Sequence, residues 1–209
     1  MHADRSVWVR RAERLVLGTI FYNAVEAGVA LWAGVRANSI ALVGFGLDSI
    51  IELAAAAVVL WRLRLESTGA VSERVEHAEN RVRRFVGATF LLLALYVAVE
   101  SVWRLVADRI AGESAVGLAL ALASLVVMPL LAAGKFRAAR HIESRALYAE
   151  AQETLACAYL SLVLFFGLAA NAWLGWWWAD AVGALLMVPW LVREGRENLS
   201  EDGTPASAA

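Results

Sequence analysis

Two acidic side chains stand four residues apart inside an otherwise apolar stretch of the chain. The stretch is LVGFGLDSIIEL, residues 42–53, and the acids are Asp48 and Glu52. Positions i and i+4 lie on one face of an α-helix, so both carboxylates would project from the same side. An acid at the centre of a membrane helix costs about 2.5–3.5 kcal/mol on insertion scales, and two ionised neighbours repel each other. A bound divalent cation would remove both penalties.

A second segment repeats this pattern. The sequence Ser-x-Ala-Leu occurs at residues 39–42 and again at 144–147, and polar residues follow both copies at the same two offsets. The second pair is also spaced i, i+4, so it shares one helix face. If the two helices pack face to face, three carboxylates and one thiol meet at similar depth. These four candidate ligands are Asp48, Glu52, Glu153 and Cys157. A chance match is the alternative, because Ala and Leu are frequent throughout the chain.

This ligand set suits a divalent metal that exchanges with protons. Carboxylates and thiolates bind metal only when deprotonated, so metal and protons compete for the same groups. The set is softer than a magnesium or calcium site and harder than a typical structural zinc site. Zinc is therefore the first expectation, with cadmium, cobalt, iron(II) and manganese(II) as alternatives. No catalytic cofactor is expected.

The composition places the chain in a lipid bilayer. Of its 209 residues 60% are hydrophobic and the mean hydropathy is +0.60, above the values of ordinary globular domains. A membrane helix needs about 20 mostly apolar residues. Charged and small polar segments, among them 62–84, 107–114 and 135–145, separate such stretches. They predict an all-α polytopic membrane domain over residues 1–199 and a disordered tail over 200–209, with six transmembrane helices near 16–35, 38–61, 84–107, 114–134, 146–171 and 177–195.

The distribution of positive charge predicts the topology. All but three of the 19 Lys and Arg residues lie on one side of the six predicted spans, and the exceptions are Arg36, Arg104 and Arg109. By the positive-inside rule, both termini are cytoplasmic. The formal net charge of -1 agrees with reading the basic runs as topology signals, and no nucleic-acid partner is expected. The charged N-terminus predicts no cleavable signal peptide.

Several other polar residues have two readings. Asn23 and Glu26, inside the first span, would form interhelical hydrogen bonds or line an ion path. Glu100 and Arg104 are spaced i, i+4 and should pair with each other. Glu150 would be a solvated helix end or a funnel for cations.

Residues outside the span centres have simpler predicted roles. Asp180 opens the sixth span, where an acid favours the helix N-terminus. His77, among acids of the second connector, belongs to a solvated linker or to a secondary metal site. Four tryptophans should anchor helices at the outer interface, namely Trp173, Trp176, Trp177 and Trp178. Cys157 alone would be a packing residue, but its place in the repeat favours a ligand role.

The motifs resemble those of the cation diffusion facilitator family of divalent-metal/proton antiporters. The resemblance covers roughly residues 12–199, and its most specific elements are NSIALVGFGLDSIIEL, SRALYAEAQETLAC and WADAVGALL. In that family the second and fifth spans bind the transported ion, which implies Asp48, Glu52, Glu153 and Cys157 as ligands here. The resemblance implies export of the cation from the cytoplasm in exchange for protons. Glu153 and Cys157 replace the usual His-x-x-x-Asp, so they put the identity of the metal in question.

The resemblance also sets expectations about assembly and location. The cytoplasmic domain that commonly follows the sixth span is expected to be absent, so a homodimer would form through the membrane helices. The near-exclusive use of Arg over Lys is typical of GC-rich bacterial genomes, and we expect a bacterial inner (plasma) membrane protein. A non-transporting membrane metal sensor is the alternative function. An enzyme is not expected, because neither HExxH nor GxSxG occurs in the sequence.

Overall fold

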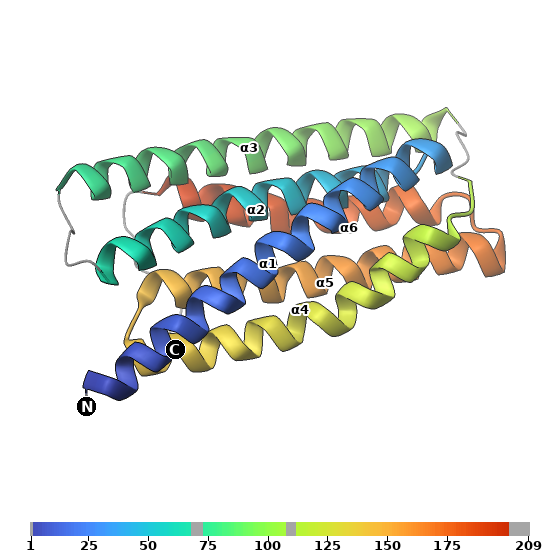
Figure 1. Ribbon diagram of the computed structural model, residues 1–209. Helices are drawn as coiled ribbons and strands as arrows, with labels where there is room; N and C mark the ends of the chain where they lie inside the picture. Colours follow the sequence, from blue (N-terminus) through green and yellow to red (C-terminus); the bar gives the residue numbers. More distant parts are fainter. Residues whose placement is uncertain (1, 68–72, 108–111, 201–209) are drawn as a thin grey trace, which may run out of the picture.

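The computed structural model describes residues 2–67, 73–107 and 112–200, and these residues form six α-helices. The helices are α1 (His2–Ala37), α2 (Ile40–Ser67), α3 (Glu73–Val106), α4 (Ala115–Ile142), α5 (Arg145–Leu174) and α6 (Ala179–Leu199) (Figure 1). The predicted all-α fold with six helices is confirmed. Ser200 forms the C-cap of α6, and the rest of the predicted tail lies outside the described residues.

The helices extend beyond the predicted spans into segments that were expected to be polar connectors. α1 begins at His2, α2 continues to Ser67, and α3 begins at Glu73, inside the predicted connector 62–84. α4 likewise continues to Ile142 through most of the predicted polar stretch 135–145. These boundaries correct the prediction. Arg, Lys, Glu and Ala are good helix formers, so a run of charges marks the edge of the bilayer and does not end the helix.

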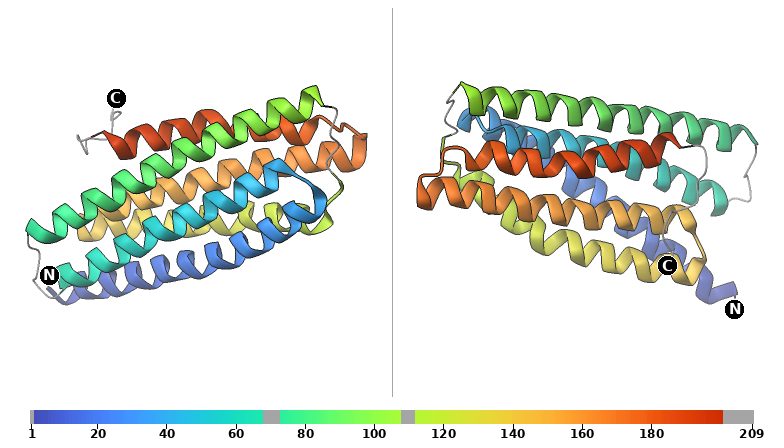
Figure 2. Two further views of the ribbon diagram at one scale, coloured as in Figure 1. Left: turned by 90° about the horizontal axis from the view of Figure 1, so that it is seen from above. Right: turned by 180° about the vertical axis from the view of Figure 1, so that it is seen from behind.

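Among the described residues, α1 to α5 each contain a stretch long and apolar enough to cross a membrane. α6 does not meet this criterion, because Asp180 lies at its start and Arg193, Glu194 and Arg196 lie near its end. It nevertheless packs against α3, α5 and α2 within the same bundle (Figure 2). The protein is a multi-pass membrane protein.

The six helices form a group of four and a pair. α1 contacts α2 and α4, and α5 contacts α4 and α2, so these four helices close a ring. The pair of α3 and α6 lies alongside, with α3 against α2 and α6 against α5 (Figure 1). α2 and α5 run in opposite directions, as the repeat predicted, and α6 ends at the end of the bundle where α1 begins.

A pair of glycines allows the close approach of α3 and α6. A Cβ atom added to Gly87 of α3 would lie 2.8 Å from the carbonyl oxygen of Gly195 on α6, closer than side chains are found. Small residues at such crossings let membrane helices pack backbone to backbone. This contact holds the helix pair together near the end of the bundle where α6 ends.

Candidate metal site

Three of the four predicted ligands converge in the interior of the bundle. One donor atom from each of Asp48 and Glu52 on α2 and Cys157 on α5 lies within 4.8 Å of the other two, and all three residues are buried. Ligand atoms at zinc-binding distance in a tetrahedral site are roughly 3.3–3.8 Å apart, so a closure of about 1 Å brings this cluster to that spacing. The cluster therefore brings two carboxylates and one thiol together in a buried position.

The fourth predicted ligand, Glu153, lies outside this group of three. It is one helical turn before Cys157 on the same face of α5, and its side chain is half-buried. It interacts electrostatically with Asp48 and with Glu194 of α6. Glu153 therefore borders the three-residue cluster, and its role as a ligand stays a prediction.

Helix α1 adds two buried polar residues to the site. Asn23 Nδ2 donates a hydrogen bond of 3.1 Å to Glu52 Oε2. Glu26, which is 1% exposed, accepts hydrogen bonds from Ser49 on α2 at 2.9 Å and from Ser124 on α4. The Sγ of Cys157 lies 3.8 Å from Glu26 Oε2 in hydrogen-bonding geometry. Glu26 therefore connects α1 to three other helices of the ring.

The sequence predicted that Asn23 and Glu26 form interhelical hydrogen bonds or line an ion path, and it did not single out Ser124. The structure shows that the predicted interhelical hydrogen bonds exist and that they contact two of the candidate ligands. The signal available in the sequence was the spacing i, i+3 of two polar residues in an apolar span. Ser124 carried no such signal, because an isolated serine is common in membrane helices.

The serines that open the two repeats cap their helices. Ser39 Oγ accepts a hydrogen bond of 3.1 Å from the backbone N–H of Leu42, and Ser144 Oγ accepts one of 3.3 Å from Leu147. An N-terminal serine satisfies one of the free N–H groups of a helix start. Part of the repeat is therefore explained by helix capping, and the acids and the thiol that follow are the part that builds the site.

Two further matched positions of the repeats both bind a charged group on a neighbouring helix. Ser49 on α2 donates to Glu26, whereas Thr154 on α5 accepts a hydrogen bond of 2.7 Å from Lys135 Nζ on α4. The same ammonium group lies 2.6 Å from Glu150 Oε1. Glu150 Oε2 has no hydrogen-bond partner among the described residues.

The positions of Lys135 and Glu150 correct the sequence-based readings. Lys135 opens the polar stretch predicted after the fourth span, and its side chain is 0% exposed. Glu150 has the predicted alternatives of a solvated helix end and a funnel for cations, and its burial against Lys135 contradicts the solvated end. A charge in such surroundings needs a partner of opposite sign, and each residue supplies that partner to the other.

Asp180 anchors a different helix from the one expected. It lies in the first turn of α6, as predicted, but it is buried and accepts hydrogen bonds from the Ser39 hydroxyl and, at 2.9 Å, from the backbone N–H of Ile40. It therefore binds the N-terminus of α2, the helix that carries Asp48 and Glu52. This contact helps to set the position of α2 relative to α6.

The predicted pair of Glu100 and Arg104 is present, with 3.0 Å between Oε1 and Nε. Arg104 also donates to the backbone and side-chain oxygens of Asn38, in the turn between α1 and α2. His77 lies on α3, but its side chain is outside the described residues, so the secondary metal site predicted there stays untested. The four tryptophans are exposed or half-buried, as interfacial anchors would be; Trp173 lies at the end of α5, and Trp176, Trp177 and Trp178 lie between α5 and α6.

The fold and the site together define a class of protein, a helical membrane protein with a buried acidic and thiol cluster at the centre of its bundle. Residues 16–203 match the model of the cation efflux transmembrane domain. The chain belongs to the cation efflux family.

A similar protein is the uncharacterised transporter sll1263 of Synechocystis sp., which is 30% identical over 188 residues. The alignment covers 85% of this chain and 61% of that transporter, so the chain spans somewhat less than two thirds of the length of this relative.

Proposed function

We propose that this protein exports a divalent transition-metal cation from the cytoplasm in exchange for protons, with zinc as the first candidate. The observation that supports this most strongly is the convergence of Asp48, Glu52 and Cys157 within 4.8 Å in the interior of a membrane-spanning bundle. Membership of the cation efflux family supports the same reading. Cadmium, cobalt, iron(II) and manganese(II) are the alternative cargoes, because a mixed carboxylate and thiolate site does not reject them.

The ligands themselves supply the coupling to protons. Asp48 Oδ2 is buried and has no hydrogen-bond partner among the described residues, so it is free to bind either a proton or a metal ion. Two adjacent carboxylates in a dry site hold protons when no cation is present, and a metal ion displaces them when it binds. Exchange of metal for protons follows from this competition.

Glu153 is the proposed fourth ligand. It shares a helix face with Cys157 and interacts electrostatically with Asp48 across the gap between α5 and α2. With Glu153 the set would contain three carboxylates and one thiolate. Such a set has the number of ligands that zinc prefers.

Transport assays in liposomes test the assignment. Purified protein in proteoliposomes should show proton flux that depends on added zinc, and Asp48→Ala should abolish it. Glu197→Gln is a matched control, because Glu197 is an exposed acid of α6 outside the site. Unchanged flux in the Asp48 variant would rule out this site.

The same purified protein distinguishes the alternative function, a membrane metal sensor, from a transporter. Glu153 lies outside the three-residue cluster, and an incomplete ligand set can bind an ion without moving it. Metal binding by calorimetry together with no uptake under a proton gradient would establish the sensor and contradict the transporter.

The orientation and assembly complete the proposal. Both termini face the cytoplasm of a bacterial cell, and two copies associate through their membrane helices. Accessibility of an N-terminal tag in intact and in permeabilised cells tests the orientation, and light scattering of the purified protein tests the dimer. A tag that is labelled in intact cells, or a monomeric mass, would contradict the respective part.

A further inference from the structure

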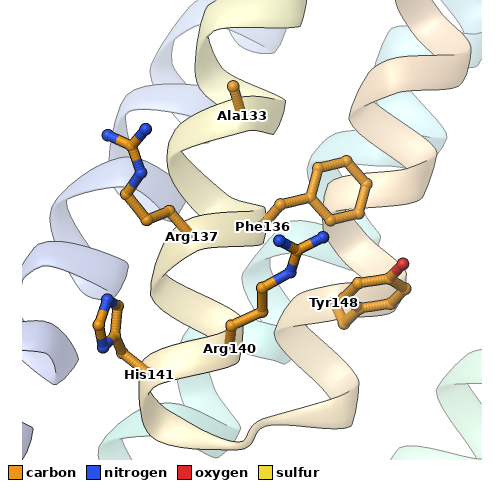
Figure 3. A pocket seen from close by; sticks show the side chains of 6 residues that line it. All are labelled: Ala133, Phe136, Arg137, Arg140, His141 and Tyr148. Carbon is orange, nitrogen blue, oxygen red and sulfur yellow. The ribbon is translucent and has the colours of Figure 1, made fainter.

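We propose that the pocket at the junction of α4 and α5 binds one anionic phospholipid by its phosphate headgroup. The pocket has a volume of about 480 Å³ and is lined by Ala133, Phe136, Arg137, Arg140, His141 and Tyr148 (Figure 3). This volume is within the range of about 300–1,000 Å³ that is usual for sites of small molecules. It lies apart from the metal cluster, and the inference does not depend on the proposed function.

The pocket carries positive charge that nothing in the described structure neutralises. Arg137 and Arg140 are exposed, and neither makes a hydrogen bond or an ion pair with any residue whose side chain is described. In Figure 3 the Arg140 guanidinium points towards the rings of Phe136 and Tyr148, while Arg137 and His141 project from the other side of α4, towards α1. Glu143 follows in the turn after α4 but does not line the pocket.

The donors in the pocket match a phosphate group. The Arg140 guanidinium group can bind a phosphate through two parallel N–H donors, and Arg137 and His141, on the α1 side of α4, add positive charge and a polar ring to the same lining. Tyr148 is exposed and contacts Phe136 with 5.0 Å between the ring centroids, and exposed tyrosines are typical of the membrane–water interface. Trp8 of α1 stacks on His141 with 4.0 Å between the ring centroids, and Arg11 lies over Trp8, so the surroundings of the pocket are interfacial and basic.

The surface that leads away from the pocket is apolar, which favours a lipid over a free anion. Leu122, Val126 and Leu130 of α4 are exposed and follow one another at four-residue intervals. The same helix face continues through Ala133 to Arg137 at the pocket. α5 presents a similar exposed stripe that starts at Tyr148 and continues through Leu155 and Leu162. A phospholipid has a phosphate at one end and acyl chains at the other, so it matches a basic pocket that continues into an apolar surface. Basic pockets between membrane helices bind anionic headgroups in this way.

Native mass spectrometry of the full-length protein tests the proposal. Protein is loaded with phosphatidylglycerol or with phosphatidylcholine, and the ratio of lipid-bound to lipid-free protein is measured. We expect the wild type to retain one phosphatidylglycerol and little phosphatidylcholine. Arg137→Gln/Arg140→Gln should lower the ratio for phosphatidylglycerol about 25-fold, because each basic residue at an anionic surface contributes about fivefold.

The control removes the same charge elsewhere at the same end of the bundle. Arg193→Gln/Arg196→Gln changes two exposed arginines of α6 outside the pocket. This variant should show the same ratio of lipid-bound to lipid-free protein as the wild type. Ala133→Trp fills the pocket without changing the charge, and it should reduce retention as the arginine variant does. Equal losses in the pocket and control variants would overturn the proposal, and so would unchanged retention in Ala133→Trp.

A soluble phosphate carries the same binding group as a lipid headgroup, so it is the alternative occupant of the pocket. Inorganic phosphate or glycerol phosphate in large molar excess should not displace the bound phosphatidylglycerol, because neither carries the acyl chains that contact the apolar stripes. Displacement by either anion would show that the pocket takes a soluble phosphate and would overturn the assignment to a lipid. Equal retention of phosphatidylcholine and phosphatidylglycerol by the wild type would overturn it as well.

Discussion

The ammonium group of Lys135 lies 2.6 Å from a carboxylate oxygen of Glu150, and both side chains are buried between α4 and α5. Lys135 also interacts electrostatically with Glu52 and Glu153, so its charge acts on the site where the acids gather. The pair holds α4 against the helix that carries two of the proposed ligands. It also places an ammonium group beside a cluster of acids.

Breaking this pair should destabilise the protein. Lys135→Met leaves the Glu150 carboxylate buried without its partner, and removing one member of a buried ion pair costs about 3–5 kcal/mol. Glu150→Gln should cost less, because the amide oxygen still accepts from the ammonium group. The free energy of unfolding in mixed micelles measures both effects.

The double variant Lys135→Met/Glu150→Gln is the internal control for this prediction. It removes both charges together, so its loss of stability should be clearly smaller than the sum of the two single losses. Additive losses would show that the two residues do not depend on each other.

The thiol of Cys157 should select for soft metals. Cys157→Ser replaces a soft ligand by a hard one, so we expect the affinity for cadmium to fall by about tenfold or more while that for manganese changes by less than about threefold. Calorimetric titration of the purified protein with each metal measures the two affinities. Asp48→Asn serves for comparison, because loss of a carboxylate should lower the affinity for both metals. Equal losses of affinity for cadmium and manganese in Cys157→Ser would contradict the prediction.

Glu26 should support metal binding from α1. Glu26→Gln keeps an oxygen that accepts from one of the two serines, Ser49 and Ser124, replaces the other oxygen by an NH2 donor, and removes the negative charge beside Cys157. Loss of such an outer partner typically lowers metal affinity about 10–100-fold, whereas the melting temperature should change little. Glu100→Gln is the matched control, because that acid pairs with Arg104 on α3. If both variants bind zinc as the wild type does, Glu26 has only a structural role.

The crossing of α3 and α6 should not tolerate a larger residue. Gly87→Ala introduces a Cβ atom 2.8 Å from the Gly195 carbonyl oxygen, and overpacking of this kind costs about 1–3 kcal/mol. Gly28→Ala on α1 is the control, because nothing lies within 4 Å of the added atom. Alanine is the better helix former by about 1 kcal/mol, so that variant should be as stable as the wild type or slightly more stable. Thermal unfolding followed by circular dichroism compares the two.

Local features of the sequence determined the class of the protein and part of its site. The length of the apolar stretches predicted six helices, and the spacing of Asp48 and Glu52 placed both on one helix face, because these properties depend only on helix geometry. The helix ends were predicted less well. Charges mark the edge of the bilayer, and the α-helix continues past it wherever the residues favour helix, as between Lys135 and Ile142.

Only the tertiary structure decided which polar groups meet. The rotation and depth of each helix bring Glu26 to Cys157, bury Lys135 against Glu150, and direct Asp180 to the start of α2. Two of these contacts join helices far apart in the sequence, and the sequence of one helix does not specify which face its neighbour will cover. Most buried polar groups of the bundle find a partner on whichever helix lies beside them, and Asp48 Oδ2 and Glu150 Oε2 are exceptions among the described residues.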